Sequence, residues 1–330
     1  MRFILAPLAG FTDAPFRRLC FEGGADLCFC EMVSAAGLAH GSSPTRHLLE
    51  TMPGEGPLAV QLFGSSESDL AGASRIVGEF VRRGGDGRVV EINLNAGCPM
   101  TKVVRTGAGA KLVEDPAKIY RLLSAMAENV DLPVTLKTRI GPHPGDMRIF
   151  EILDAAEKAG ARGIVVHARY TSQMHGGEVH LDLLAEVVRR SHVPVTGNGS
   201  IKDSESASKM ASTGVDAIMV GRAALAEPSI FARLKDPSSP GALRSLVAAR
   251  RHIELLLEYR EFLARRDPKG RVPSVDALVS VKMHTHLFRY FAGLPGAAEM
   301  RRRLNSVRTL RETEEILRAA EEAFTAADPF

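Results

Sequence analysis

The stretch Val89-Val90-Glu91-Ile92-Asn93-Leu94-Asn95-Ala96-Gly97-Cys98-Pro99 joins an apolar strand to a loop that presents a single thiol. Its first half, with two valines and an isoleucine, is typical of a buried parallel strand. Gly97 allows the backbone to approach a flat ligand closely, and Pro99 fixes the chain just after the sulfur. We therefore interpret Cys98 as a thiol held out for chemistry. A loop cysteine without a role is the alternative.

Similar apolar runs recur along the first two thirds of the chain. They cover residues 3–8, 27–33, 58–63, 89–93, 134–138, 164–167, 194–197 and 217–220. Stretches with one apolar helical face separate them, for example residues 117–130 and 150–159. Eight strand–helix units predict an α/β fold of the (β/α)8 TIM-barrel type. An open doubly wound sheet is the alternative, but it usually carries a G-x-G-x-x-G turn after its first strand, and this chain does not.

Polar residues stand at the carboxyl ends of six consecutive predicted strands, which is where a TIM barrel builds its active site. They are Gln61, Asn93 and Asn95, Lys137 and Arg139, His167 and Arg169, Asn198, and Arg222. Any one of them alone is better explained by a structural hydrogen bond. Their repetition at successive strand ends predicts one shared pocket.

Small residues follow the last two strands, in the segments Gly197-Asn198-Gly199-Ser200 and Gly221-Arg222. Backbone N–H groups of such segments can approach phosphate oxygens, and a guanidinium adds a charge-assisted bond. With Lys137 across the barrel mouth, this phosphate site suits flavin mononucleotide (FMN), because a lysine stabilises the negative charge of the reduced ring. A phosphorylated sugar substrate without a flavin is the alternative, and the cysteine loop argues against it.

A series of short motifs follows in order along nearly the whole chain. They are Ala6-Pro7-Leu8-Ala9-Gly10-Phe11-Thr12-Asp13-Ala14-Pro15-Phe16-Arg17, Glu31-Met32, Gln61-Leu62-Phe63-Gly64, Asn95-Ala96-Gly97-Cys98-Pro99, Lys137-Thr138-Arg139, Val166-His167-Ala168-Arg169, Gly197-Asn198-Gly199, Gly221-Arg222 and Gly293-Leu294-Pro295-Gly296-Ala297-Ala298-Glu299-Met300-Arg301. With this order and spacing the chain resembles the dihydrouridine synthases, flavin enzymes that reduce uridine to dihydrouridine in transfer RNA (tRNA). Leu8 stands where that family usually has methionine, and Tyr170 with Gln173-Met174-His175 replaces a common Gly-Arg-Thr pattern.

The resemblance implies a cofactor site and an acid. Residues that would hold FMN are Pro7, Leu8, Ala9, Gln61, Lys137, His167, Asn198, Gly199, Gly221 and Arg222, and we add Ser200 as part of the phosphate segment. Cys98 would be the general acid, and NADPH or NADH would reduce the flavin. Reduction of uracil needs a hydride on C6 and a proton on C5, and an ordinary thiol, with a pKa of about 8.5, is protonated at pH 7. We expect Asn95, Arg139 and Arg169, together with His167, to bind the uracil.

The end of the chain is predicted to form a small helical bundle after the linker segment Asp236-Pro237-Ser238-Ser239-Pro240-Gly241. Helices are expected over residues 243–266, 274–293, 297–306 and 309–326, the last opening with a Thr309-x-x-Glu312 capping box. We therefore predict a catalytic barrel over residues 1–236, a linker over 237–241 and a helical tRNA-binding domain over 242–330.

Positive charge is concentrated in the predicted bundle. From residue 241 onward there are 16 Lys plus Arg against 12 Asp plus Glu, a net charge of +4, whereas the whole chain carries +3. We expect Arg301, Arg302 and Arg303 to bind phosphates of tRNA. A solvated helix face is the alternative for this run.

The four cysteines, Cys20, Cys28, Cys30 and Cys98, lack paired spacing, which predicts a reducing compartment and neither disulfides nor a metal site. No stretch is long and apolar enough to predict a membrane span. We expect a cytoplasmic monomer. Two other classes remain open: an FMN barrel that acts on a free pyrimidine or another small unsaturated substrate, and an RNA-binding protein whose barrel has lost catalysis.

Overall fold

The computed structural model describes residues 1–83, 88–238, 245–266, 272–294 and 296–327, and their contacts divide the chain into two compact units. The first unit comprises Met1–Gly10, Asp26–Thr51 and Gly56–Gly221. The second comprises Phe11–Ala25, Met52–Glu55 and Arg222–Phe330. The expected linker over residues 237–241 lies partly outside the described residues, so the proposed domain boundaries stay a prediction.

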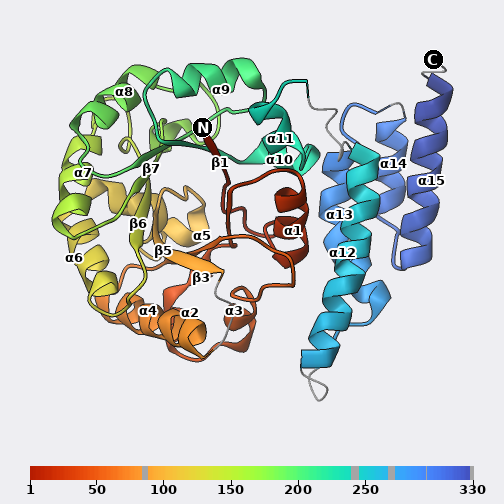
Figure 1. Ribbon diagram of the computed structural model, residues 1–330, viewed down its shortest axis with the longest axis horizontal. Coiled ribbons are helices and arrows are strands. Elements are labelled where there is room, and N and C mark those ends of the chain that lie inside the picture. Colours follow the sequence, from red (N-terminus) through yellow and green to blue (C-terminus); the bar gives the residue numbers. More distant parts are fainter. Residues whose placement is uncertain (84–87, 239–244, 267–271, 295, 328–330) are drawn as a thin grey trace. The chain divides into compact units, whose positions relative to one another are not determined.

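The first unit is a closed barrel of parallel strands (Figure 1). Its strands are β1 (Arg2–Leu5), β2 (Leu27–Phe29), β3 (Val33–Ser34), β4 (Leu58–Phe63), β5 (Val89–Ala96), β6 (Val134–Arg139), β7 (Ile164–His167), β8 (Val195–Asn198) and β9 (Ala217–Val220). Strand β1 pairs with both β9 and β2, and β2 and β3 both pair with β4. Since β2 and β3 occupy one position, the barrel has eight strand positions and the predicted TIM barrel is confirmed.

The second strand position differs from its prediction. A continuous strand was expected over residues 27–33, but the chain breaks into β2 and β3 between Phe29 and Val33. Within the break, the Glu31 carboxylate accepts a hydrogen bond from the Gly10 N–H at 2.5 Å, in the loop that follows β1. The prediction of one strand was therefore wrong, because the step from Phe29 to Val33 has one residue more than the matching step from Ala59 to Leu62 on β4, and this extra residue interrupts the ladder.

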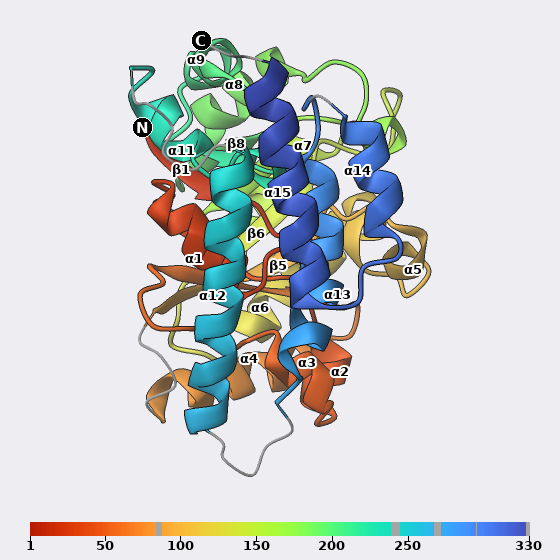
Figure 2. The same ribbon diagram turned by 90° about the vertical axis from the view of Figure 1, so that its right-hand side faces the viewer.

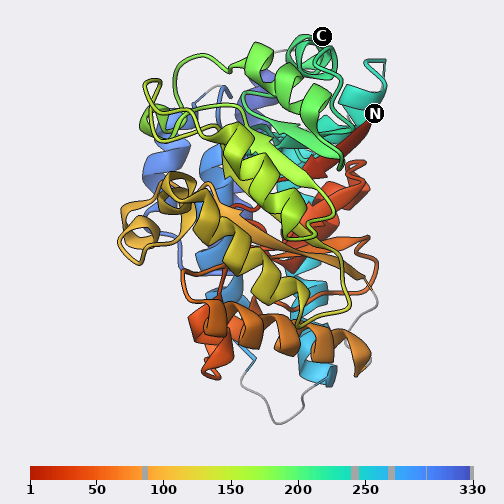
Figure 3. The same ribbon diagram turned by 90° about the vertical axis from the view of Figure 1, so that its left-hand side faces the viewer.

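Helices lie along the outside of the strands (Figures 1 and 3). In the first unit they are α2 (Ala35–Ala39), α3 (Ser43–His47), α4 (Glu67–Arg82), α5 (Thr101–Val104), α6 (Pro116–Ala127), α7 (Ile149–Lys158), α8 (Leu181–Arg190) and α9 (Ser204–Ala211), with 3-10 helices η1 (Gly109–Glu114) and η2 (Thr171–Gln173). Helix α6 shows how sequence sets these elements. Asp115 caps its first turn by accepting the Lys118 N–H, Pro116 starts it, and its predicted apolar face is buried.

Apolar side chains from β1, β2, β4, β7 and β9, with Ala6 just after β1, pack together in the barrel. One buried cluster joins Ile4 and Ala6, Leu27 and Phe29, Ala59, Val165, and Ala217 and Met219. Burial of a large apolar side chain contributes about 1.5–3 kcal/mol. The barrel is therefore a packed core, and the polar residues that could form a site lie at the strand ends.

The second unit is helical (Figure 2). Its helices are α1 (Ala14–Glu22), α10 (Arg222–Ala226), α11 (Ile230–Lys235), α12 (Ser245–Arg266), α13 (Val275–Tyr290), α14 (Ala297–Leu304) and α15 (Leu310–Ala327). Helices α12, α13 and α15 pack against one another, and α1 packs on α12. The predicted capping box is confirmed, because the Glu312 N–H donates to Thr309 Oγ1 at 3.2 Å and the Thr309 N–H donates to Glu312 Oε2 at 3.0 Å. The expected helix start at residue 243 lies outside the described residues.

A buried ion pair fixes the short segment Met52–Glu55 to α1. Arg17 Nε lies 2.8 Å from Glu55 Oε2, and the side chains are 1% and 0% exposed. Arg17 Nη1 also donates to the Thr12 carbonyl, and Glu55 Oε1 accepts the Met52 N–H at 2.7 Å. Both charges are therefore compensated by each other and by backbone groups, which a buried pair requires.

Replacement Glu55→Ala should lower the free energy of unfolding by about 3–5 kcal/mol, because it leaves the Arg17 guanidinium buried without its counter-charge. Urea unfolding followed by circular dichroism measures this loss. The control Glu261→Ala removes the exposed partner of Arg265 and should cost less than about 1 kcal/mol. Equal effects of the two variants would contradict the assignment.

Candidate active site

Buried amide side chains link the ends of β4 and β5 in a chain of hydrogen bonds. Asn95 Nδ2 donates to Gln61 Oε1 at 2.7 Å, and Gln61 Nε2 donates to Asn93 Oδ1 at 2.8 Å. Asn93 Nδ2 continues the chain to Thr135 Oγ1 on β6 at 2.8 Å. Parallel register sets these partners beside one another, with Gln61 opposite Asn93 and Asn95 opposite Lys137. The amide of Asn95 is therefore held in one orientation.

That orientation lets Asn95 support the cysteine loop. Its Oδ1 accepts the N–H groups of Gly97 at 3.1 Å and Cys98 at 3.0 Å. From the other side, the Cys98 carbonyl accepts the Ala110 N–H at 2.9 Å. A side chain at Gly109 (φ +61°) would place its Cβ 2.7 Å from the Cys98 carbonyl oxygen, so this close approach requires glycine. Cys98 itself is half-exposed, so a fixed loop presents an accessible thiol.

Lys137, His167 and Asn198 come from three neighbouring strands. Lys137 Nζ donates to Asn198 Oδ1 at 3.3 Å, and Asn198 Nδ2 donates to the Met219 carbonyl at 2.8 Å. Burial, and then the nearby Arg139, lower the pKa of Lys137 to about 8, although Cys98 partly offsets them. Burial, with Lys137 and other cations adding to it, also holds the pKa of His167 far below its ordinary value. His167 is therefore a neutral imidazole near pH 7.

Arg139 and Arg169, which the sequence predicts to bind the uracil, make several hydrogen bonds within the protein. Arg139 is 1% exposed and donates to the carbonyls of Gly97 at 2.9 Å, Tyr170 at 3.0 Å and Met174 at 2.7 Å. Arg169 donates to Ser200 Oγ at 2.6 Å, and its Nη1 lies 3.2 Å from His167 Nε2. These contacts bring Arg169 together with His167 and Ser200 of the predicted cofactor set, whereas Arg139 bonds only backbone carbonyls.

The other predicted cofactor residues lie in three loops after strands. Pro7 and Leu8 are half-exposed and Ala9 is exposed after β1, and the Ala6 N–H donates to the Val220 carbonyl, which places this loop beside the one at Gly221. Gly199 follows β8 with φ +136°, a conformation that favours glycine. Arg222 is exposed, and its contacts group it with the second unit.

The predicted phosphate-binding arginines lie on α14 in the second unit. Arg302 pairs with Glu299 at 2.5 Å, and Arg303 is exposed. Arg301 is half-buried, and its Nε has no hydrogen-bond partner among the described residues.

The turn over residues 170–178 was marked in the sequence only as a departure from a family pattern. Gln173 organises it, because its Oε1 accepts the Tyr170 N–H at 2.8 Å and its Nε2 donates to the Glu178 carbonyl at 3.1 Å. Met174 has φ +51°, which is uncommon outside glycine, and its side chain is exposed. No side-chain motif could have indicated this arrangement, because its partners are mostly backbone groups.

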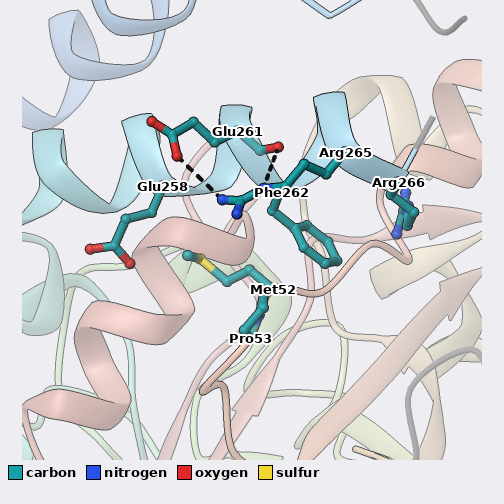
Figure 4. A pocket seen from close by; sticks show the side chains of 7 residues that line it. All are labelled: Met52, Pro53, Glu258, Glu261, Phe262, Arg265 and Arg266. Carbon is teal, nitrogen blue, oxygen red and sulfur yellow. Dashed lines mark hydrogen bonds and ion pairs between the residues drawn. The ribbon is translucent and has the colours of Figure 1, made fainter. Parts of the chain in front are cut away.

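A cavity of about 600 Å³ within the second unit contains none of the predicted site residues (Figure 4). Met52 and Phe262 form part of its apolar lining. Its arginines already have partners, since Arg265 pairs with Glu261 and Arg266 lies over the Phe262 ring. In the described ranges, no group of three or more His, Cys, Asp or Glu residues is placed to hold a metal ion. None of the helices described there is long and apolar enough to cross a membrane.

Comparison with known proteins gives consistent matches over most of the chain. A family model described as dihydrouridine synthase matches residues 4–327. The tRNA-dihydrouridine synthase B of Klebsiella pneumoniae is 36% identical over 243 residues, covering 73% of this chain and 74% of the relative. The protein of the same name from Pseudomonas aeruginosa is 32% identical over 313 residues, covering 92% and 88%. The crystal structure of TcOYE with pHBA aligns with a TM-score of 0.51 at 12% identity, covering 72% and 89%, which shows the fold alone.

Replacement Lys137→Met should change how stability depends on pH. The pKa of Lys137 is about 8 in the folded protein and 10.5 ordinarily, so between these values the unfolded state binds more protons and wild-type stability rises with pH. At 1.36 kcal/mol per pKa unit, the variant should be more stable than wild type by up to about 3 kcal/mol at pH 7. This advantage should shrink as pH rises from 8 to 10.5.

Urea unfolding of protein freed of small molecules, at pH 7 and at pH 10, measures the difference. Lys158→Met replaces an exposed lysine of α7 and serves as the control, with no pH-dependent advantage expected. An advantage of Lys137→Met that stays constant with pH would show that the ammonium is not desolvated.

Proposed function

Because the chain belongs to the dihydrouridine synthase family, we propose that it is the oxidoreductase that reduces specific uridines of tRNA to dihydrouridine. The observation that carries this proposal is the half-exposed Cys98 on a fixed loop beside Lys137 and Asn95. The thiol S–H is the proton donor, and the strand-end residues around it bind the cofactor and the base.

The residues of the site suit an anionic cofactor such as FMN. Within the described residues, the charged groups that shift the pKa values of Lys137 and Arg139 are other cations and Cys98, with no carboxylate among them. Such uncompensated positive charge favours binding of phosphate and of an anionic ring. The residues proposed to hold FMN are Pro7, Leu8, Ala9, Gln61, Lys137, His167, Asn198, Gly199, Ser200, Gly221 and Arg222.

Each side chain has a definite part in the reaction. The residues named above would hold FMN, which when bound and reduced by NADPH or NADH would supply a hydride for C6 of the uracil. Cys98 donates the proton to C5, so that both atoms of the double bond become saturated. With its pKa at about 8, Lys137 stays mostly protonated at pH 7 and stabilises negative charge in the pocket. The neutral His167 forms hydrogen bonds without adding further positive charge.

The base must leave its stack to meet Cys98. A thiol at the end of barrel strands cannot reach a stacked base, so the target uridine is flipped out of a folded loop of the tRNA. Asn95 and Arg169 are proposed to contact the uracil, and Arg301, Arg302 and Arg303 the phosphates. Arg139, also expected from the sequence to bind the base, is not included, because its Nε, Nη1 and Nη2 all donate to backbone carbonyls. All four cysteines are free, which supports a reducing compartment, and we place the enzyme in the cytoplasm as a monomer.

Replacement Cys98→Ala should slow reduction of tRNA uridine by about 10²- to 10⁴-fold, the usual effect of removing a positioned general acid. The flavin content of the variant and the rate at which NADPH reduces the bound flavin should not change, because the thiol takes part only in protonation. Dihydrouridine formed in a tRNA transcript is measured by mass spectrometry of the digested RNA. Cys20→Ala, at a fully buried cysteine of α1, is the matched control and should keep near wild-type turnover. Near wild-type turnover by Cys98→Ala would remove the thiol from the mechanism.

Replacement of Arg301, Arg302 and Arg303 by alanine should weaken tRNA binding and flatten its salt dependence. Removal of each arginine that binds a phosphate should reduce the slope of log K against log salt by up to about 0.9, the value for a duplex. Binding is measured by fluorescence anisotropy at several salt concentrations.

The matched control removes three charges from α4 and its C-cap instead, by changing Arg75, Arg82 and Arg83 to alanine. That control should bind tRNA nearly as wild type does. If the α14 variant kept its affinity and slope, those arginines would lie on a solvated face.

A further inference from the structure

The Arg139 side chain joins two loops of the barrel mouth. Its Nε donates to the Gly97 carbonyl, immediately before Cys98, and its Nη1 and Nη2 donate to the carbonyls of Tyr170 and Met174. All three nitrogens are therefore engaged with the backbone, and the side chain is almost completely buried. A single planar group thus fixes the cysteine loop and the turn after β7 in one relative position.

Burial of the Arg139 guanidinium costs free energy, because the charge is removed from water. Burial, with Arg169 nearby, lowers the pKa of Arg139 to about 10, and carbonyl dipoles take the place of a carboxylate partner. Buried charges of this kind can often be replaced by apolar side chains without loss of stability. A buried arginine that apolar side chains could replace points to a role in holding the two loops in position rather than in stabilising the fold.

The turn at the far end of Arg139 is itself strained. Met174 has φ +51° and ψ −102° although it is not glycine, and such backbone persists only where its surroundings hold it. The Arg139 bond to the Met174 carbonyl and the bonds of Gln173 hold it here. The next residue, His175, stacks its ring on His167 with 6.3 Å between centroids. The turn therefore lies directly at the proposed base pocket.

We propose that Arg139 is a positioning residue that ties the orientation of Cys98 to the conformation of the turn over residues 170–178. A substrate RNA that seats on this turn moves or fixes the Tyr170 and Met174 carbonyls, and the guanidinium transmits that change to Gly97 and so to the thiol. The proposal rests on the proposed function in taking Cys98 as the acid. It makes the acid responsive to RNA on the turn, which a free nucleoside would not contact.

The rate at which iodoacetamide alkylates Cys98 in the folded protein tests this coupling without any turnover. Cys20, Cys28 and Cys30 are buried, and peptide mass spectrometry identifies the labelled site. Arg139→Lys cannot reach all three carbonyls, so it should raise the alkylation rate by roughly twofold or more, the lower range for contacting residues. Gln173→Ala loosens the turn and should raise the alkylation rate of Cys98 by a similar factor. In protein that already carries Arg139→Lys, adding Gln173→Ala should cause no further increase.

Two further variants complete the experiment. Arg148→Lys makes the same chemical change at an arginine bonded to Asp146, away from the cysteine loop, and should leave the alkylation rate unchanged. If Arg139→Lys does not fold, Gln173→Ala alone must still raise the rate.

Kinetics separate this role from a direct contact. A positioning role predicts that Arg139→Lys lowers kcat for tRNA more than it raises KM. A higher KM with unchanged kcat and unchanged alkylation would make Arg139 a base contact and overturn the proposal. The proposal would also be overturned if the alkylation rate of the double variant were raised by the product of the factors measured for Arg139→Lys and Gln173→Ala alone. Activity retained by Cys98→Ala would instead refute the acid assignment and leave the measured coupling intact.

Discussion

The common direction of the barrel strands is the constraint on which the site depends. In a closed parallel barrel every strand ends on the same side, so polar residues distant in sequence meet there. Register places Asn95 beside Lys137, and His167 beside Arg139 on one side and Asn198 on the other. Burial, and after it the nearby cations, lower the pKa values of Lys137 and His167. The fold itself therefore gathers cationic side chains at one end of the barrel, which favours an anion there.

Hydrogen bonds then fix what the register brings together. The side-chain hydrogen bonds of Asn95 and Gln61 satisfy buried polar groups. They also orient Asn95 Oδ1, which accepts the N–H groups of the loop that carries Cys98. Arg139 performs the corresponding task between that loop and the turn after β7. Burial of a charge costs free energy unless its hydrogen bonds compensate it, and these contacts at the same time hold the loop that carries the thiol.

Repeated patterns in the sequence predicted most of the architecture. Apolar periodicity located most of the strands and helices, and polar residues at strand ends indicated the candidate site. Apart from the capping box of Thr309 and Glu312, interactions between side chains and backbone were not predictable in the same way. Glu31 lies in the break between β2 and β3 and accepts the Gly10 N–H, and Arg139 donates to carbonyls of two loops rather than to a ligand. Nothing in residue type or spacing encodes these partners, because backbone carbonyls are present at every position.

The most direct test of the proposed function is to incubate purified protein with an unmodified tRNA transcript, FMN and NADPH and to analyse the pyrimidines. We predict that uridine at defined positions is converted to dihydrouridine, while free uridine under the same conditions is not reduced. Unchanged tRNA, together with reduction of free uridine or another small unsaturated compound, would contradict this function and would identify a flavin barrel with a small-molecule substrate.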